Sequence, residues 1–315
     1  MHRTSLISLT ILGLSSAACS PVVIDEREVC GSGEVTVFAE GSTFPFSALA
    51  LDATHVYWST VDKIMVAPKS GGPPAVFAEH FSEVFWIAVD ETNVYAHGQP
   101  EQGVPGIYSL GKAGNASPKL LAETVVVNNA VLDRDRIYWS AGGLSFVPKA
   151  GGAPTLLHNQ PVGAFALDLE RAYFVDKSTS DAAIVSVPKL APLPPQKLPH
   201  IVELTDGDTP ILADGERLYY WTGSDIVSVP NVGGEPSLLV SESDRVGSLL
   251  VDPECLFWTI GPTSEPDRTR VRAARRGGEV VTVSASPGYV RSLVADRSGV
   301  YWLDTDKAAI MKLSR

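Results

Sequence analysis

The sequence of 315 residues has few of the residue types on which catalytic and metal sites are usually built. It contains three cysteines, three methionines and six histidines, and charged residues make up only 19% of the chain. The histidines show no metal-ligand spacing, and neither a His-Glu-x-x-His motif nor a Gly-x-Ser-x-Gly nucleophile elbow is present. No apolar run reaches the ~18 residues of a membrane-spanning helix. With 25 Lys and Arg against 36 Asp and Glu, the net charge of −11 makes nucleic acid a poor default partner.

The composition instead favours a folded protein with many turns. Hydrophobic residues make up 44% of the chain, far above the level of a disordered protein. The 27 glycines and 23 prolines interrupt long helices and favour short strands joined by turns.

The N-terminus has the layout of a secretion signal. Arg3 is followed by the short apolar run 6–14 and by the small residues 15–18, which end just before Cys19. This segment resembles a bacterial lipoprotein signal, which implies cleavage before Cys19 and a lipid on its thiol. The resemblance divides the chain into a signal peptide (1–18), a lipidated tether (19–34) and a folded domain (35–315).

One departure leaves an alternative open. Ser16 stands where lipoprotein signals usually carry Leu, and cleavage after Ala18 by a general signal peptidase would give a soluble secreted protein. Ser20, rather than Asp, follows the cysteine, which by the enteric sorting rule implies the outer membrane. Either route places the domain outside the cytoplasm, and the side of the envelope that it faces stays open.

A repeat fills the rest of the chain. Its core reads apolar-x-apolar-Asp, four residues, and then an aromatic pair, as in residues 49–58 (LALDATHVYW). The repeats are 35 to 46 residues apart, about 41 on average. Their seven aspartates are Asp52, Asp90, Asp133, Asp168, Asp214, Asp252 and Asp296.

A second landmark and the chain ends complete the predicted fold. Val-Pro-Lys-x-Gly-Gly (147–152) and its variants follow the aromatic pair, and a short apolar run such as 76–79 (VFAE) comes next. Four short strands in about 40 residues are typical of a propeller blade. The last repeat lacks its fourth strand, and residues 37–40 (VFAE) match it. We therefore predict an all-β, seven-bladed propeller closed by the N-terminal strand, in preference to six or eight blades.

The motif Tyr57-Trp58-Ser59-Thr60 resembles the YWTD propeller repeats of lipoprotein receptors. The combination of Asp-x4-Val-Tyr-Trp with Val-Pro-Lys-x-Gly-Gly is more similar still to bacterial propeller lipoproteins. The resemblance covers about residues 35–315 and implies a binding scaffold rather than a reaction. The receptor repeats close six blades, whereas this chain has seven copies.

The repeated residues are interpreted as structural, because seven equivalent copies cannot form one active site. Each aspartate is expected to accept N–H bonds from the turn that follows the first strand. If Cys19 carries lipid, Cys30 and Cys255 remain as an even pair in an oxidising compartment. Cys255 occupies a turn of the sixth repeat and Cys30 leads into the neighbouring last blade, so we predict a disulfide between them.

Positions that break the repeat are the candidates for function. Those before each first strand are expected to surround the mouth of the central channel, where aromatic, amide and charged groups would suit a partner protein, peptide or glycan. A cap over the core is the alternative role of the aromatic ones. The predicted ligand-binding residues are Phe46, Phe85, Trp86, Asn128, Asn129, Asp208, Tyr289 and Arg291.

Two other functions stay open. An enzyme of the lyase or lactonase type would need a metal at the channel mouth, yet Asp206 and Asp208 are more typical of a solvated turn than of a Ca²⁺ site, so no cofactor is predicted. A structural subunit of an envelope complex would need a stoichiometric partner and no small ligand. The basic run 268–276 is expected either to dock an anionic partner or to line a solvent-exposed strand.

Overall fold

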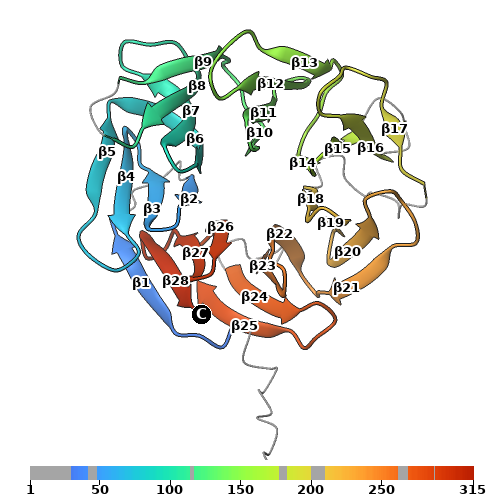
Figure 1. The fold of residues 1–315 in the computed structure, drawn as a ribbon. Helices are drawn as coiled ribbons and strands as arrows, with labels where there is room; N and C mark the ends of the chain where they lie inside the picture. The colour runs from blue at the N-terminus through green and yellow to red at the C-terminus, as the bar shows by residue number, and fades with distance from the viewer. Residues whose placement is uncertain are drawn as a thin grey trace, which may run out of the picture.

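The computed structural model confirms the seven-bladed β-propeller. In the part of the chain that the structure describes, 28 strands form seven four-stranded antiparallel sheets arranged around a central axis (Figure 1). Within the part of the chain that is described, no helix is long and apolar enough to cross a membrane. The structure describes residues 30–41, 48–113, 117–176, 183–199, 210–261, 269–286 and 288–315.

The strands follow one another from the inside of each blade to the outside. Blade 1 consists of β2 (Leu49–Leu51), β3 (His55–Ser59), β4 (Lys63–Pro68) and β5 (Ala75–Glu79). Blade 2 consists of β6 (Phe81–Val89), β7 (Asn93–Pro100), β8 (Gly106–Gly111) and β9 (Lys119–Glu123). Blade 3 consists of β10 (Asn129–Leu132), β11 (Arg136–Ser140), β12 (Leu144–Pro148) and β13 (Thr155–His158). Blade 4 consists of β14 (Phe165–Leu167), β15 (Arg171–Asp176), β16 (Ala183–Pro188) and β17 (Gln196–Lys197). Blade 5 consists of β18 (Leu212–Ala213), β19 (Arg217–Thr222), β20 (Asp225–Pro230) and β21 (Ser237–Ser241). Blade 6 consists of β22 (Arg245–Val251), β23 (Cys255–Gly261), β24 (Thr269–Arg275) and β25 (Val281–Ser286). Blade 7 consists of β26 (Val290–Asp296), β27 (Gly299–Asp304), β28 (Ala309–Ser314) and β1 (Val35–Glu40).

The ring closes as the sequence predicted. The N-terminal strand β1 is antiparallel to the C-terminal strand β28, from Val35 opposite Leu313 to Glu40 opposite Ala309, and the two lie side by side in Figure 1. Blade 7 therefore takes three strands from the end of the chain and one from its beginning. This pairing covers the outer edge of β28, which would otherwise offer unpaired backbone groups to another chain.

The hydrophobic core is divided into seven parts, one at each junction between neighbouring blades. The aromatic pair of the repeat contributes to two of them. Tyr57 packs in the core between blades 1 and 2, and Trp58 packs in the core between blades 7 and 1. Successive residues of a strand point to opposite sides of its sheet, so adjacent aromatic residues hold a blade to both neighbours.

The two ends of the blades differ in what they carry. The turns between first and second strands, such as 52–54, lie at one end together with the Gly-Gly turns, and we call this end the turn face. The connections from one blade to the next, such as 124–128, lie at the other end together with the hairpins between second and third strands. We call this end the linker face. The repeat residues populate the turn face, so sequence differences between blades are free to gather on the linker face.

Candidate functional site

The repeat aspartates accept hydrogen bonds from the backbone of the turns that follow the first strands. Asp52 accepts hydrogen bonds at Oδ1 from the backbone N–H groups of Thr54 (2.7 Å) and His55 (2.7 Å), and at Oδ2 from the Tyr57 hydroxyl (2.9 Å). These bonds tie the turn to the start of the second strand. The same arrangement occurs at Asp90, Asp168 and Asp214.

A contact that the sequence analysis missed links each aspartate to the next blade. Lys112, which follows β8, donates to Asp52 Oδ2 of blade 1 (2.6 Å) and to the backbone oxygen of Asp90 in its own blade. Each blade thus reaches back to the one before, and the contacts close into a circle. The seven pairs are Lys69–Asp296, Lys112–Asp52, Lys149–Asp90, Lys189–Asp133, Asn231–Asp168, Arg276–Asp214 and Arg315–Asp252.

These contacts keep the carboxylates ionised. Burial alone would raise the pKa of Asp52, but hydrogen bonds from Lys112, from the turn N–H groups and from Tyr57 together lower that pKa well below its usual value. Burial and the hydrogen bond to Asp214 raise the pKa of Tyr219 to about 12. Neither group exchanges protons near neutral pH, so the aspartates act as structural anchors rather than as acids or bases.

The linker face is most elaborate at blade 2. Strands β6 and β7 have nine and eight residues, whereas β2 and β3 of blade 1 have three and five. The longer pair extends the sheet at this end and contains an irregularity between Ser82 and Trp86. Glu83 lies within this bulge and has a φ of 58°, a left-handed conformation that is costly for a residue with a side chain.

Apolar side chains are exposed around this extension. The exposed fractions are 47% for Phe85, 40% for Val104, 76% for Val125 and 53% for Val126. Phe85 stacks on His97 with ring centroids 6.1 Å apart, and His97 Nε2 lies 3.3 Å from the backbone oxygen of Thr124. These contacts connect the bulge of blade 2 to the segment that leads into blade 3.

His97 is a support for this surface rather than an exposed group. It is only 3% exposed, and burial, its main influence, lowers its pKa. Its Nδ1 atom has no hydrogen-bond partner in the structure. Ser140 has a similar position on β11 and donates to the oxygen of Gly163 in the next connection. His97 thus holds the 124–128 connection in place as Ser140 holds the following one.

Carboxylates surround the apolar side chains. Glu79 and Glu101 lie on either side of His80, 4.0 and 3.7 Å from its ring nitrogens. Glu83 acts electrostatically on His97, and Glu123 on Tyr108, whose hydroxyl donates to the backbone of Val104. We call this surface the blade-2 crest; its members are Phe85, Val104, Val125, Val126, Glu79, Glu83, Glu101 and Glu123.

Only part of the crest is predictable from the sequence. Phe85 breaks the repeat next to a first strand and is therefore a predicted site residue, whereas the valines and the glutamates are not. Residues 125–127 form an apolar run between two strands, which was an available signal for a surface segment. The glutamates gave no comparable signal, since carboxylates are ordinary in surface turns.

The other predicted rim residues lie in several places. Trp86 packs against the core between blades 2 and 3, and Asn128 and Asn129 lie beside the crest where β10 begins. Tyr289 is 44% exposed on blade 7, with the Arg291 guanidinium 5.5 Å from its ring centroid. Blade 1 separates this pair from blade 2, so the rim residues form two groups rather than one site. Phe46, Asp206 and Asp208 lie outside the described residues.

The basic run pairs with nearby carboxylates. Arg270 lies 3.8 Å from Asp244, and Arg272 lies 3.5 Å from Glu242. Arg276 belongs to the circle of inter-blade contacts. These partners favour the structural interpretation of the run over an anionic docking site. Among the described residues no group of three or more His, Cys, Asp or Glu is placed to hold a metal ion.

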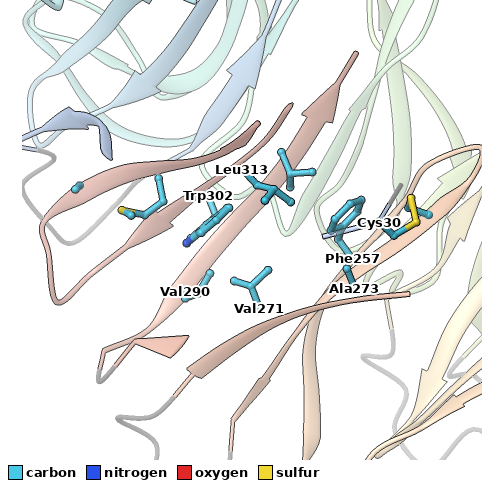
Figure 2. Packing of buried hydrophobic residues seen from close by; sticks show 11 residues of the cluster. Cys30, Phe257, Val271, Ala273, Val290, Trp302 and Leu313 are labelled. Carbon is cyan, nitrogen blue, oxygen red and sulfur yellow. A yellow bond between two sulfur atoms is a disulfide. The ribbon is translucent and has the colours of Figure 1, made fainter. Parts of the chain in front are cut away.

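The point where the chain enters the propeller is fixed at the turn face. Cys30 forms a disulfide with Cys255 at the start of β23, with the two Cα atoms 5.8 Å apart. Figure 2 shows Cys30 beside Phe257 in the core between blades 6 and 7. Gly31 and Gly33 then line a pocket of about 670 Å³ with the turn aspartates Asp252 and Asp296.

Comparisons with known proteins support the fold and go no further. No family model matches the chain, and no curated protein matches it. Among solved structures it is similar to virginiamycin B lyase from Staphylococcus aureus (TM-score 0.67, 9% identity, 90% of this chain and 99% of that one). It is also similar to BamB from Moraxella catarrhalis (TM-score 0.55, 12% identity, 90% and 92%).

A third similar structure is PorZ of Porphyromonas gingivalis, described as a surface component of the type-IX secretion system (TM-score 0.61, 17% identity, 87% of this chain and 37% of that one). At these identities the likeness concerns the fold alone, and a lyase stands beside proteins of other roles. The chain is thus a seven-bladed β-propeller whose activity has to be argued from its own surfaces.

Proposed function

We propose that this protein is a non-catalytic scaffold, lipid-anchored outside the cytoplasm, that binds a partner protein through its linker face. The observation that carries the proposal is the exposure of Phe85, Val104, Val125 and Val126 on one part of that face. Clustered apolar surface on a folded domain is typical of a protein interface.

The turn face has a different task. Its aspartates hold neighbouring blades together with lysine or arginine in six blades and with Asn231 in blade 5, so the contact recurs around the ring. A binding surface that distinguishes one partner from others needs groups that occur once, and these groups lie on the linker face. This difference between the two faces supports a scaffold whose turn face stabilises the ring of blades and whose linker face binds the partner protein.

The expected anchor agrees with this arrangement. Eleven residues separate Cys19 from Cys30, and an extended chain of that length spans at most ~40 Å. Because Cys30 is held at the turn face by Cys255, a lipid on Cys19 would bring the membrane closer to the turn face than to the linker face. The blade-2 crest would then point away from the membrane, toward other envelope proteins.

Purification of the full-length protein from its own membranes tests the proposal. The variant is Phe85→Ser/Val126→Ser, chosen because both side chains are exposed, whereas Trp86 packs in the core. The matched control is Leu169→Ser/Val232→Ser, since both residues are exposed and belong to turn-face loops. Co-eluting proteins are identified by mass spectrometry, and bound metal is measured in the same fractions.

The proposal expects a stoichiometric protein that is lost with the crest variant and kept with the control. A partner kept by both variants would favour a structural subunit bound elsewhere. A protein without a partner but with stoichiometric metal, or with a co-eluting glycan, would overturn the proposal in favour of an enzyme or a glycan-binding protein. The presence of a lipid on Cys19 is read in the same experiment from the mass of the N-terminal peptide.

A further inference from the structure

We infer that the blade-2 crest recognises a basic polypeptide segment, one in which apolar side chains are flanked by lysine or arginine. The inference rests on the proposed function and specifies the chemistry of the partner. It depends on the arrangement of charge around the exposed apolar side chains.

The charge of blade 2 is separated between its two ends. All four crest glutamates lie at the linker end, and the side chains of Glu79 and Glu101 are 57% and 69% exposed. Both lysines of the blade lie at the opposite end, where Lys112 binds Asp52 and Lys119 donates to the backbone oxygen of Ala150. Lys63 of blade 1, opposite Glu79 in the sheet, is the one lysine close to the crest among the described residues of blades 1 and 2.

The repeat aspartates of the turn face differ from the crest glutamates in their partners. On the turn face, each repeat aspartate binds a cation or an amide donor from the next blade. The negative charge of these aspartates is therefore compensated by a nearby partner. On the crest, His80 is the neighbour of two glutamates, and no arginine or lysine neutralises them in an ion pair within the described residues. The crest therefore keeps an excess of negative charge for a partner to match.

The apolar side chains set the second requirement. Val125 and Val126 belong to a connection that is held in place by two contacts. His97 contacts the backbone oxygen of Thr124, and the Thr124 hydroxyl donates a hydrogen bond to the backbone oxygen of Val126 (2.8 Å). Phe85 is oriented by its stacking on His97. Side chains that are exposed and already held in place lose little conformational freedom when a partner covers them.

Backbone strain at the crest agrees with a functional role. His80 and Glu83 have φ values of 54° and 58°, a left-handed conformation that is unfavourable for a non-glycine residue. At Glu83 this conformation belongs to the bulge that brings the glutamate and Phe85 to the surface together. An anionic lipid surface is disfavoured as the occupant, because the glutamates would repel it.

Binding of two labelled peptides to the full-length protein tests the inference by fluorescence anisotropy. One peptide alternates lysine with phenylalanine and valine, and the other carries glutamate in place of every lysine. The crest variant is Glu83→Gln/Glu101→Gln/Glu123→Gln. The control variant is Glu91→Gln/Glu170→Gln/Glu216→Gln, which neutralises three exposed glutamates of the turn face and changes the net charge equally.

The lysine peptide should bind at least about tenfold more tightly than the glutamate peptide, and more weakly as salt rises from about 50 to about 300 mM. The crest variant should weaken its binding about fivefold or more, whereas the control should change it less than twofold. Equal weakening by both variants would show general attraction to an acidic protein and would overturn the inference. Loss of the lysine preference would overturn it as well.

The co-purified partner separates this inference from the proposed function. If the native partner is lost with Phe85→Ser/Val126→Ser but kept with the triple glutamine variant, the crest is a docking surface and its basic specificity is wrong. If both crest variants keep the partner, the proposed function itself is wrong. Circular dichroism of each variant checks that the propeller is intact.

Discussion

At the scale of single residues, strain and burial distinguish the positions that serve the fold from those available for binding. Most residues with positive φ are glycines of turns, such as Gly71 and Gly72 after β4. Glu83 is different, because it carries a charged side chain in a conformation that glycine adopts without cost.

Replacement of Glu83 should therefore separate stability from binding. Glu83→Gly is expected to increase the free energy of unfolding by about 0.5–1 kcal/mol, because it relieves the left-handed strain. Glu83→Gln, which keeps the strain and removes the charge, should leave stability unchanged within about 0.5 kcal/mol. Urea unfolding followed by tryptophan fluorescence measures both. A Gly variant less stable than wild type would contradict the expectation.

At the scale of elements, the propeller is a set of similar blades joined by one repeated contact, and blade 5 departs from it. In six junctions a lysine or arginine binds the aspartate of the preceding blade, but Asn231 takes this place opposite Asp168 (3.1 Å). The same junction contains the shortest fourth strand, the two residues of β17. Among the described residues, this junction therefore has neither the ion pair of the repeat nor a long outer strand.

Restoring the repeat at this junction should strengthen the ring. Asn231→Lys is expected to raise the free energy of unfolding by about 0.5–1 kcal/mol, since a lysine can bind Asp168 as Lys189 binds Asp133. The reverse change, Lys112→Asn, is the matched control and should lower it by about 1–3 kcal/mol, because Asp52 would lose its charged partner. Denaturant midpoints of the two variants test this, and a shift in the same direction for both would contradict it.

At the scale of the whole molecule, stability depends on closing the ring. The disulfide joins residues 225 positions apart and bridges the N-terminal segment of blade 7 to blade 6. It acts together with the pairing of β1 and β28, so the two ends of the chain are held at one junction. Loss of this closure exposes the core between blades 6 and 7, which contains Trp302 and Phe257 (Figure 2).

Removal of the disulfide should destabilise the protein without changing its fold. Cys30→Ala/Cys255→Ala is expected to lower the free energy of unfolding by about 2–5 kcal/mol, because a long loop is no longer constrained in the unfolded chain. Wild-type protein unfolded with a reductant should match the double variant. A gain of two hydrogens on reduction, measured by mass spectrometry, tests the bond itself, and no mass change would exclude it.

The pH dependence of stability follows from the ring of aspartates. Hydrogen bonds and cations lower the pKa of Asp52, Asp90, Asp168, Asp214 and Asp296 in the folded state despite their partial burial. Groups of this kind stabilise the fold above their unfolded pKa of about 3.9, and the stabilisation is lost as pH falls toward the folded pKa. The urea midpoint should stay nearly constant from pH 7 to about 5 and fall steeply below about 4. A midpoint unchanged at pH 3 would contradict this account.

The blade count, the closure by the N-terminal strand and the seven turn aspartates were all predictable from the amino-acid sequence. These features are local patterns that recur at a fixed spacing, so Asp52 and Tyr57 could be recognised beside their six counterparts. The bond from Asp52 to Lys112 was invisible, because the partners are 60 residues apart and belong to different blades. The lysine of the Val-Pro-Lys motif is recognisable in the sequence as part of the repeat. Its bond to the aspartate of the preceding blade becomes evident only in the arrangement of the blades around the ring.

Tertiary structure alone decided which candidates share a surface. Phe85 belongs to β6 of blade 2 and Val126 to the connection that leads into blade 3, and their association depends on how the 124–128 connection crosses the end of blade 2 beside His97. Trp86 and Phe85 are neighbours in sequence, yet Trp86 packs against the core between blades 2 and 3, whereas Phe85 points to the opposite side, stacks on His97 and remains exposed. A repeated sequence pattern shows which positions are equivalent from blade to blade. A binding surface depends instead on contacts between segments that are not equivalent, and the repeat gives no information about these contacts.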